Sequence, residues 1–242
     1  MTAPDRSALY AAIDRTWPAE RVERRGPLTL RFTDGGGSRV RAASLDPGWT
    51  EADIAAGETA MAEAGQPILW VIRGGDEGLD AALEARGYRV KDPVTLWLAP
   101  VRDLARGPVP PVRTFEVWPP LACQREIWAE GGVGADRLRI MERAADPKIT
   151  LLGRDSDTPA ATVFAACDGP LAMLHALEVR ARFRRRGLGA DMTRAVARWA
   201  ARQGASHLAL LAVTANAGAT ALYSSLGMRP MEGYHYRIKD LP

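Results

Sequence analysis

The apolar residues of this chain follow two different spacings, which together predict a mixture of helices and strands. Between residues 188 and 202, Leu188, Met192, Val196 and Trp199 recur every three or four positions with arginines between them, as in an amphipathic helix. Short apolar runs beside glycine or proline, such as 171–179, are typical of strands. We therefore expect helices over 7–16, 50–63, 78–86, 121–129, 135–144, 188–202 and 217–225, and strands over 26–32, 39–45, 67–73, 94–99, 149–153, 160–166, 171–179, 207–213 and 234–238.

The segment 107–112, which begins Gly-Pro-Val-Pro-Pro, interrupts this pattern near the middle of the chain. Prolines spaced so closely exclude a helix or a central strand, because proline lacks the backbone N–H. We predict a linker there, between an N-terminal α/β domain over 1–106 and a C-terminal domain over 113–242.

Both halves have a similar order of elements. In each, a helix ends at a glycine, an apolar strand follows, and a second helix ends at another glycine; these are Gly65 and Gly87 in the first half and Gly204 and Gly227 in the second. The halves are either divergent copies of one unit or two α/β segments with a common arrangement. Within the first half, residues 34–37 (Asp-Gly-Gly-Gly) are interpreted as a hairpin turn rather than an anion-binding nest.

Composition limits the class of protein. No apolar run is long enough to span a membrane and the N-terminus lacks the layout of a signal peptide, so we expect a soluble, cytoplasmic protein without a membrane partner. The two cysteines, Cys123 and Cys167, lie too far apart in sequence for a metal knuckle or redox pair. Neither His207 nor His235 has neighbours spaced like zinc ligands. We expect free thiols and no metal.

The net charge of +3 is too small to predict a nucleic-acid partner, but the arginines are unevenly distributed. Eight of them lie between residues 180 and 202, where Asp191 is the only carboxylate. Such a stretch is either a solvated helix face with a basic loop or a surface that attracts a polyanion.

Two glycines decide between these interpretations. Gly187 and Gly189 stand between the strand that ends at Val179 and the helix that begins at Leu188. Glycine lets the backbone approach a bulky anion, and the first-turn N–H groups of a helix lack intrahelical partners, so this turn is suited to phosphate. A Walker loop would need Gly-Lys-Ser or Gly-Lys-Thr, and a dinucleotide fingerprint would need a glycine where Met192 stands.

The remaining pattern, Arg-x-x-Gly-x-Gly from Arg184 to Gly189, resembles the coenzyme A loop of the GCN5-related N-acetyltransferase (GNAT) superfamily. Asn216, Tyr223 and Gly227 follow in the order of the family's strand-Asn-helix-Tyr-Gly segment. The resemblance covers the second half and implies an α/β (α+β) fold, with a mixed, mostly antiparallel sheet flanked by helices. It also implies acetyl-coenzyme A as co-substrate. The first half lacks both signals and is either a degenerate GNAT-like copy or an accessory domain.

The resemblance also implies the residues that contact the donor. In that family the strand before the turn pairs with the pantetheine arm, the turn holds the pyrophosphate, and the asparagine fixes the end of the arm. The corresponding residues here are Leu177, Val179, Arg184, Arg185, Arg186, Gly187, Leu188, Gly189, Ala190, Asn216 and Tyr223.

For catalysis, the resemblance assigns Tyr223 as the acid that protonates the departing thiolate. The run Leu174-His175-Ala176-Leu177 is similar to the arylalkylamine branch, which favours His175 as the general base. Strand alternation would place His175 and Glu178 on opposite faces, so only one of them could serve, and water is a third candidate. Leu211 stands where the ribosomal-protein branch has a glutamate, which argues against that branch.

We therefore expect an N-acetyltransferase that transfers acetyl from acetyl-coenzyme A to an amine of a small molecule or peptide by direct attack. A non-catalytic coenzyme A-binding or interaction module is the alternative, because fold alone does not fix function. The acceptor and the oligomeric state are not indicated; residues 118–143 are expected to line the acceptor pocket.

Overall fold

The structure, a computed structural model, describes residues 3–239; residues 1–2 and 240–242, the outer ends of the two predicted domains, lie outside the described residues. Backbone contacts divide the chain into two compact units. Unit 1 combines the segment through Pro18 with Leu96–Ala212 and Asn216–Met231, and unit 2 combines Ala19–Thr95 with Val213–Ala215 and the segment from Glu232 onward.

These units do not follow the contiguous boundaries that we predicted. The first helix, α1 (Arg6–Thr16), belongs to unit 1, and the strands β5 (Arg89–Pro100) and β11 (Arg229–Lys239) each run through both units. The predicted linker lies within unit 1, where Arg198 Nη2 donates to Gly107 O at 2.8 Å. Closely spaced prolines exclude regular elements, but they do not prevent side chains of a neighbouring helix from holding the segment.

Unit 1 is built on a sheet with the strand order β10-β9-β8-β7-β6. The strand bounds are Thr114–Val117 (β6), Lys148–Asp155 (β7), Thr158–Asp168 (β8), Leu171–Val179 (β9) and His207–Val213 (β10). The pairs β6–β7, β7–β8 and β8–β9 are antiparallel, and β9–β10 is parallel. The prediction of a mixed, mostly antiparallel sheet is confirmed.

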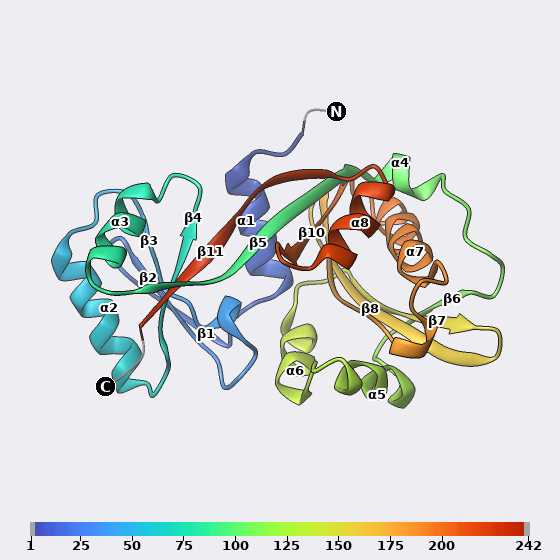
Figure 1. Cartoon of the computed structure of the whole chain (residues 1–242), viewed down its shortest axis with the longest axis horizontal. Helices are drawn as coiled ribbons and strands as arrows, with labels where there is room; N and C mark the ends of the chain where they lie inside the picture. The colour runs from blue at the N-terminus through green and yellow to red at the C-terminus, as the bar shows by residue number, and fades with distance from the viewer. Residues whose placement is uncertain (1–2, 240–242) are drawn as a thin grey trace. The chain divides into compact units, whose positions relative to one another are not determined.

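Helices cover both faces of this sheet (Figure 1). On one face, α7 (Leu188–Arg202) packs Met192 and Val196 into a core that includes Val163 of β8, together with α4 (Val101–Ala105) and α8 (Ala217–Ser225). On the other face, α5 (Ala122–Glu130) carries Gln124, whose Nε2 donates to Thr162 Oγ1 at 3.2 Å. Thr162 and Val163 are neighbours in one strand and so point to opposite faces. The helix α6 (Ala135–Arg143) follows α5.

The elements nearest the predicted site have the bounds expected from the sequence. The helices α7 and α8 and the strands β9 and β10 agree with the predicted ranges residue for residue. The three-residue turn η2 (Ala181–Phe183) connects β9 to the residues before α7. The strong period of α7, the short apolar runs of the strands and the flanking glycines explain this agreement.

Unit 2 has a sheet in the order β1-β2-β3 and a helix pair around β4. The bounds are Arg21–Arg25 (β1), Leu28–Phe32 (β2), Ser44–Leu45 (β3), Glu51–Glu63 (α2), Ile68–Arg73 (β4) and Glu77–Ala85 (α3). A Cβ on Gly57 of α2 would lie 2.4 Å from Trp70 Cη2, so glycine is required for α2 to pack this closely on β4.

The tight hairpin turn predicted at residues 34–37 is wrong, although the strands on either side of it do pair. β2 pairs antiparallel with β3, Leu28 with Leu45 and Thr29 with Ser44, and it also pairs with β1 across the Gly26-Pro27 turn. Gly35, Gly36 and Gly37 all have positive φ, and the following residues form the short 3-10 turn η1 (Ser38–Val40). Three successive positive-φ residues do not match the backbone of a two-residue hairpin turn.

The glycines that suggested a repeat end their helices in the same way. Tyr88 N donates to Leu83 O at 3.1 Å after Gly87, and Met228 N donates to Tyr223 O at 3.1 Å after Gly227. Both glycines have positive φ, 83° and 74°. The common caps agree with the repeated pattern, while the relationship between the halves stays a prediction.

Candidate functional site

The parallel strands β9 and β10 separate partway along their length. Their register runs from His207 with Leu171 to Leu210 with Leu174, although β9 continues to Val179. Beyond Leu174, the edge of β9 that faces β10 lacks the ladder of hydrogen bonds that a paired strand would supply. This opening presents backbone donors and acceptors to a bound molecule.

A β-bulge brings His175 and Glu178 to the same face of the sheet. His175 lies opposite Phe164 and Glu178 opposite Thr162, so a step of three residues in β9 matches a step of two in β8. Ala176, within this step, has φ 49°. Phe164 and Thr162 point to one face because they are two residues apart, and their partners do the same. The prediction that alternation separates His175 from Glu178 is therefore wrong.

The turn before α7 has an uncapped helix N-terminus. Gly187 has φ 80° and no side chain caps it, while Arg185, with φ 63°, is also left-handed. The N–H groups of Leu188, Gly189 and Ala190 belong to the first turn and have no intrahelical acceptor. The positive end of the helix dipole adds to the attraction for an anion.

Gly189 has a second role besides the one predicted. A Cβ there would lie 2.9 Å from Leu222 Cδ2, so the absence of a side chain lets the first turn of α7 pack against α8. Gly187 differs, because the nearest atom to an added Cβ is Asp191 Oδ2 at 3.8 Å. Gly187 is thus required by its backbone angle, and Gly189 by the helix contact.

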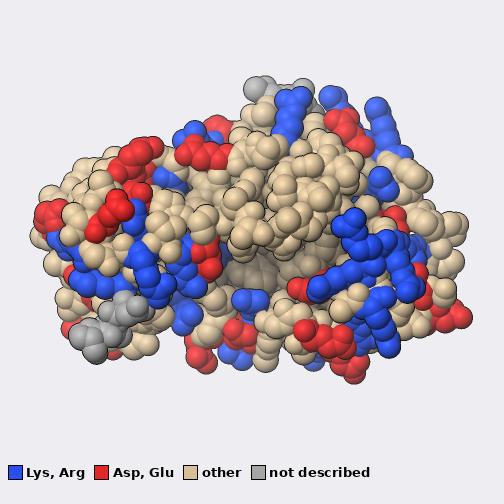
Figure 2. All heavy atoms as spheres, viewed as in Figure 1, with Lys and Arg blue, Asp and Glu red and all other residues tan. Residues whose placement is uncertain are grey.

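The three arginines of the turn differ in their contacts. Arg184 Nε donates to Val179 O at 3.0 Å, and Arg186 Nη1 pairs with Asp155 Oδ2 at 2.8 Å. Arg184, Arg185 and Arg186 are all exposed, and Figure 2 shows basic side chains gathered on the α7 side of unit 1. The charge of Arg186 is partly offset, which leaves Arg184 and Arg185 as the main basic groups of the turn.

Sequence reasoning missed a side-chain network that holds this turn. Arg113 pairs with Asp155 at 2.8 Å and with Asp191 at 3.1 Å, and its Nη2 donates to Arg186 O at 2.8 Å. Hydrogen bonds from Arg113, which has the larger effect, and from Arg186 lower the pKa of Asp155. No local pattern could have found Arg113 or Asp155, because both are distant from the turn in sequence.

Asn216 forms the N-cap of α8. Its side-chain Oδ1 accepts a hydrogen bond from Ala219 N at 3.0 Å, which fixes the amide at the end of β10. The side chain is exposed. The cap uses the amide oxygen, and the N–H₂ group of the same amide is suited to donate to a ligand.

Tyr223 is part of the unit 1 core. The residue is 6% exposed, and its ring lies 6.0 Å from that of Trp97, centroid to centroid. Burial raises the pKa of the phenol, so the hydroxyl remains protonated at neutral pH. A protonated phenol is suited to proton donation.

His175 is enclosed on the face opposite α7. Its ring stacks on Phe164, with centroids 6.0 Å apart, and lies 5.0 Å from the ring of Trp17. The Thr16 hydroxyl donates to Ala12 O at 2.6 Å and therefore accepts from His175 Nε2 at 2.9 Å. This arrangement holds the imidazole within a packed cluster.

Glu178 lies on the same face, beside the end of α5. A Cβ on Gly131 would be 2.4 Å from Glu178 Cδ, so the glycine makes room for the carboxyl. Burial raises the pKa of Glu178, although the charges of Arg184 and Arg137 partly oppose the shift. A half-buried carboxylate with a raised pKa is suited to accept a proton near neutral pH.

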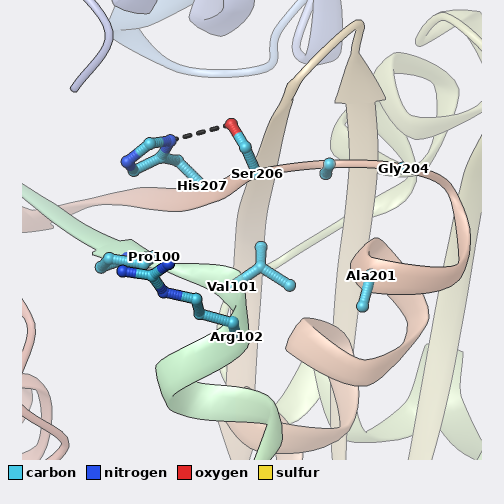
Figure 3. A pocket seen from close by; sticks show the side chains of 8 residues that line it. Pro100, Val101, Arg102, Ala201, Gly204, Ser206 and His207 are labelled. Atoms are coloured by element: carbon cyan, nitrogen blue, oxygen red, sulfur yellow. Dashed lines mark hydrogen bonds between the residues drawn. The ribbon is translucent and has the colours of Figure 1, made fainter. Parts of the chain in front are cut away.

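A separate pocket of about 240 Å³ lies at the opposite end of β10 (Figure 3). Val101, Arg102 and Gly204 line it, and Ser206 Oγ is hydrogen-bonded to His207 Nδ1 at 2.9 Å. Burial lowers the pKa of His207, and the Arg102 charge adds to the effect. This pocket begins at the first residue of β10, away from the opening and from Asn216, so it does not belong to the predicted site.

Unit 2 has no equivalent of the uncapped turn at the start of α2. Thr50 N and Thr50 Oγ1 both donate to Asp53 Oδ2 at 2.7 Å. Glu51 adds another acidic group to the first turn. A helix start that is already capped by a carboxylate repels phosphate.

Within residues 3–239, no three or more His, Cys, Asp or Glu side chains gather in a way that could hold a metal ion. Among the same residues, no helix has the length and apolar character needed to cross a membrane. Cys123 is half-buried and Cys167 buried, and both are free thiols.

Comparison with known proteins agrees with these features. Residues 116–228 match the Acetyltransferase (GNAT) family. The uncharacterized N-acetyltransferase YobR of Bacillus subtilis (strain 168) is 26% identical over 240 residues, which cover 93% of this chain and 94% of that protein.

Two solved structures are similar in fold. A GCN5-related N-acetyltransferase from Kribbella flavida has a TM-score of 0.72 at 20% identity. The aligned residues cover 97% of this chain and 94% of that chain. A tandem GNAT protein from the clavulanic acid biosynthesis pathway has a TM-score of 0.62 at 16% identity. The aligned residues cover 89% of this chain and 80% of that chain. The family match runs from β6 to α8, and it identifies residues 116–228 as an acyltransferase domain of the GNAT family.

Proposed function

We propose that unit 1 binds acetyl-coenzyme A in the opening between β9 and β10 and transfers the acetyl group to an amine. The observation that carries this proposal is the end of β9–β10 pairing at Leu174 and Leu210, followed along the chain by the uncapped turn at Gly187. The strand edge suits the amides of a pantetheine arm, and the helix start suits phosphates.

The described residues fit the donor on several counts. Exposed Arg184 and Arg185 provide charge for phosphates, and Arg113 holds the turn through Asp155 and Arg186 O. Asn216 is fixed by its cap to Ala219 and retains an amide donor. When bound, the thioester supplies an activated acetyl group.

The residues of the chain divide the chemistry between an acid and a base. Tyr223 keeps its proton at neutral pH and donates it to the departing sulfur. Glu178 accepts the proton of the attacking amine, directly or through a water molecule. Holding the two reactants together supplies much of the remaining rate enhancement.

We assign the base to Glu178 rather than to His175. The Nε2 of His175 is occupied by Thr16, and the ring is enclosed by Phe164 and Trp17. Glu178 instead has room beside Gly131 and a raised pKa. His175 then has a structural role, and its catalytic role is the competing assignment.

Release of coenzyme A thiol in the presence of a panel of primary amines tests the proposal. Wild-type protein should release thiol with a subset of amines, and Glu178→Gln should lower the rate far more than His175→Gln does. A larger loss of rate in His175→Gln than in Glu178→Gln would identify His175 as the base. Saturable binding of acetyl-coenzyme A without turnover on any amine would favour a non-catalytic binding module.

A further inference from the structure

The indole N–H of Trp97 is a buried donor without a hydrogen-bond partner among the described residues. Trp97 lies in β5 and is only 3% exposed. Two other buried tryptophans behave differently: Trp70 Nε1 donates to Tyr88 Oη at 3.3 Å, and Trp128 Nε1 donates to Ala176 O at 2.7 Å. An unpaired buried donor destabilises a fold, so its retention calls for a reason.

The position of Trp97 suggests that reason. Its ring contacts Tyr223, the proposed acid, at 6.0 Å between centroids and an interplanar angle of 45°. The core cluster that contains both rings also includes Leu174 and Leu210, the last paired residues before β9 and β10 separate. Trp97 therefore belongs to the same core cluster as the two residues at which the strands separate.

We propose that Trp97 is a donor-contacting residue whose indole N–H donates to a carbonyl oxygen of the pantetheine arm or the thioester. This inference rests on the proposed binding of acetyl-coenzyme A in unit 1. It adds a residue from the N-terminal half of the sequence, outside residues 116–228, to the donor site. Tyr223 and Trp97 would then supply two polar hydrogens from within an otherwise apolar core cluster.

The apolar surroundings of Trp97 favour the pantetheine arm over the phosphates as the acceptor. Trp97 lies among buried apolar side chains, including Ala99, Leu210 and Met228. A charged phosphate is costly to bury beside Trp97. The exposed arginines of the turn offer the phosphates a more favourable place to bind. A neutral carbonyl costs less to desolvate than a charged phosphate, so it is the better acceptor for this buried N–H.

Two ligands and two variants separate this role from a purely structural one. Acetyl-coenzyme A contains the arm, whereas adenosine 3′,5′-bisphosphate carries nucleotide phosphates without it. Trp97→Phe removes the unpaired donor, and Trp70→Phe is the matched control, because it removes a buried indole whose N–H is already paired. Calorimetric titration with both ligands and urea denaturation without ligand are measured for each protein.

Trp97→Phe should raise the Kd of acetyl-coenzyme A by roughly threefold to tenfold, the effect of one neutral hydrogen bond, and leave the Kd of the bisphosphate unchanged. Its urea midpoint should fall less than that of Trp70→Phe, because it also removes an unpaired donor. Trp70→Phe should leave both Kd values unchanged. In wild type, acetyl-coenzyme A alone should move the proton resonance of the Trp97 indole N–H downfield, a readout independent of the variants.

The inference is overturned if Trp97→Phe binds acetyl-coenzyme A as tightly as wild type, or if it loses both ligands equally. An indole resonance that stays in place on addition of acetyl-coenzyme A would also overturn it. Failure of wild type to bind either ligand is a different result, because it would refute the proposed function on which the inference rests.

Discussion

Gly187 and Gly204 form a matched pair for testing the phosphate turn. Both are in unit 1, beside helix α7, with nearly equal φ values of 80° and 81°. An added Cβ would meet nothing within 4 Å at Gly204, and only Asp191 Oδ2 at 3.8 Å at Gly187. Aspartate at either position therefore causes the same backbone strain, but only at Gly187 does it place a carboxylate at the start of α7.

The expected magnitudes differ between stability and binding. A left-handed residue other than glycine costs roughly 1 kcal/mol, which corresponds to a fall in Tm of about 2–4 °C for a chain of this size. This backbone cost is common to both variants, but a carboxylate is favourable at the start of α7 and unfavourable at its end, so the Tm of Gly204→Asp should fall more. At the turn, two like charges about 4 Å apart repel by at most about 4 kcal/mol at an effective dielectric constant of 20. Solvent and salt reduce this, so Gly187→Asp should raise the Kd of acetyl-coenzyme A by roughly tenfold to a hundredfold.

Thermal denaturation and calorimetric titration measure the two effects on the same preparations. Gly204→Asp should bind acetyl-coenzyme A like wild type despite its lower Tm. Equal weakening in both variants would mean that stability, rather than the turn, controls binding. An unchanged Kd for Gly187→Asp would refute the assignment of phosphate to this turn.

Other variants test the remaining roles. Tyr223→Phe should reduce kcat by about 10²-fold to 10⁴-fold, the range for loss of a general acid, with little change in acetyl-coenzyme A affinity; an unchanged kcat would make the tyrosine structural. Because burial raises the pKa of Glu178, the ionised form is disfavoured in the folded state, so Glu178→Gln should raise the urea midpoint above that pKa. This gain in urea midpoint should disappear as the pH falls below the ordinary glutamate range. The acidic limb of the pH–rate profile should also be lost in Glu178→Gln. A variant less stable than wild type at neutral pH would contradict this prediction. Thr16→Val should lower the free energy of unfolding by about 1–3 kcal/mol, because His175 Nε2 loses its acceptor, while turnover changes little; a large loss of turnover at unchanged stability would restore a catalytic role to His175.

The sequence allowed the donor side of the site to be predicted closely. Helix α7, helix α8 and strands β9 and β10 have the expected bounds, because α7 has a strong apolar period, the strands are short apolar runs, and glycines lie close to the ends of these elements. The positive φ of Gly187 and the capping role of Asn216 are local properties of short segments. Local patterns are therefore sufficient to locate this part of the site.

Features that depend on distant residues could not be predicted. The bulge at Ala176 shifts Glu178 to the face of His175, and only the register with β8 reveals it. Arg113 supports the turn through Asp155, and the strands β5 and β11 run through both units rather than staying with their own halves. Pairing between segments far apart in the chain decides each of these features, and a single sequence carries no periodic signal for it.

One molecule of acetyl-coenzyme A should bind per chain, at the turn before α7. Calorimetric titration of wild-type protein at low and high salt measures both the number of sites and their dependence on charge. We expect saturable binding with a stoichiometry of one, because α2 of unit 2 begins with the Asp53 cap, and weaker binding at high salt, because charged groups hold the phosphates. No saturable binding, or a stoichiometry of two, would contradict it.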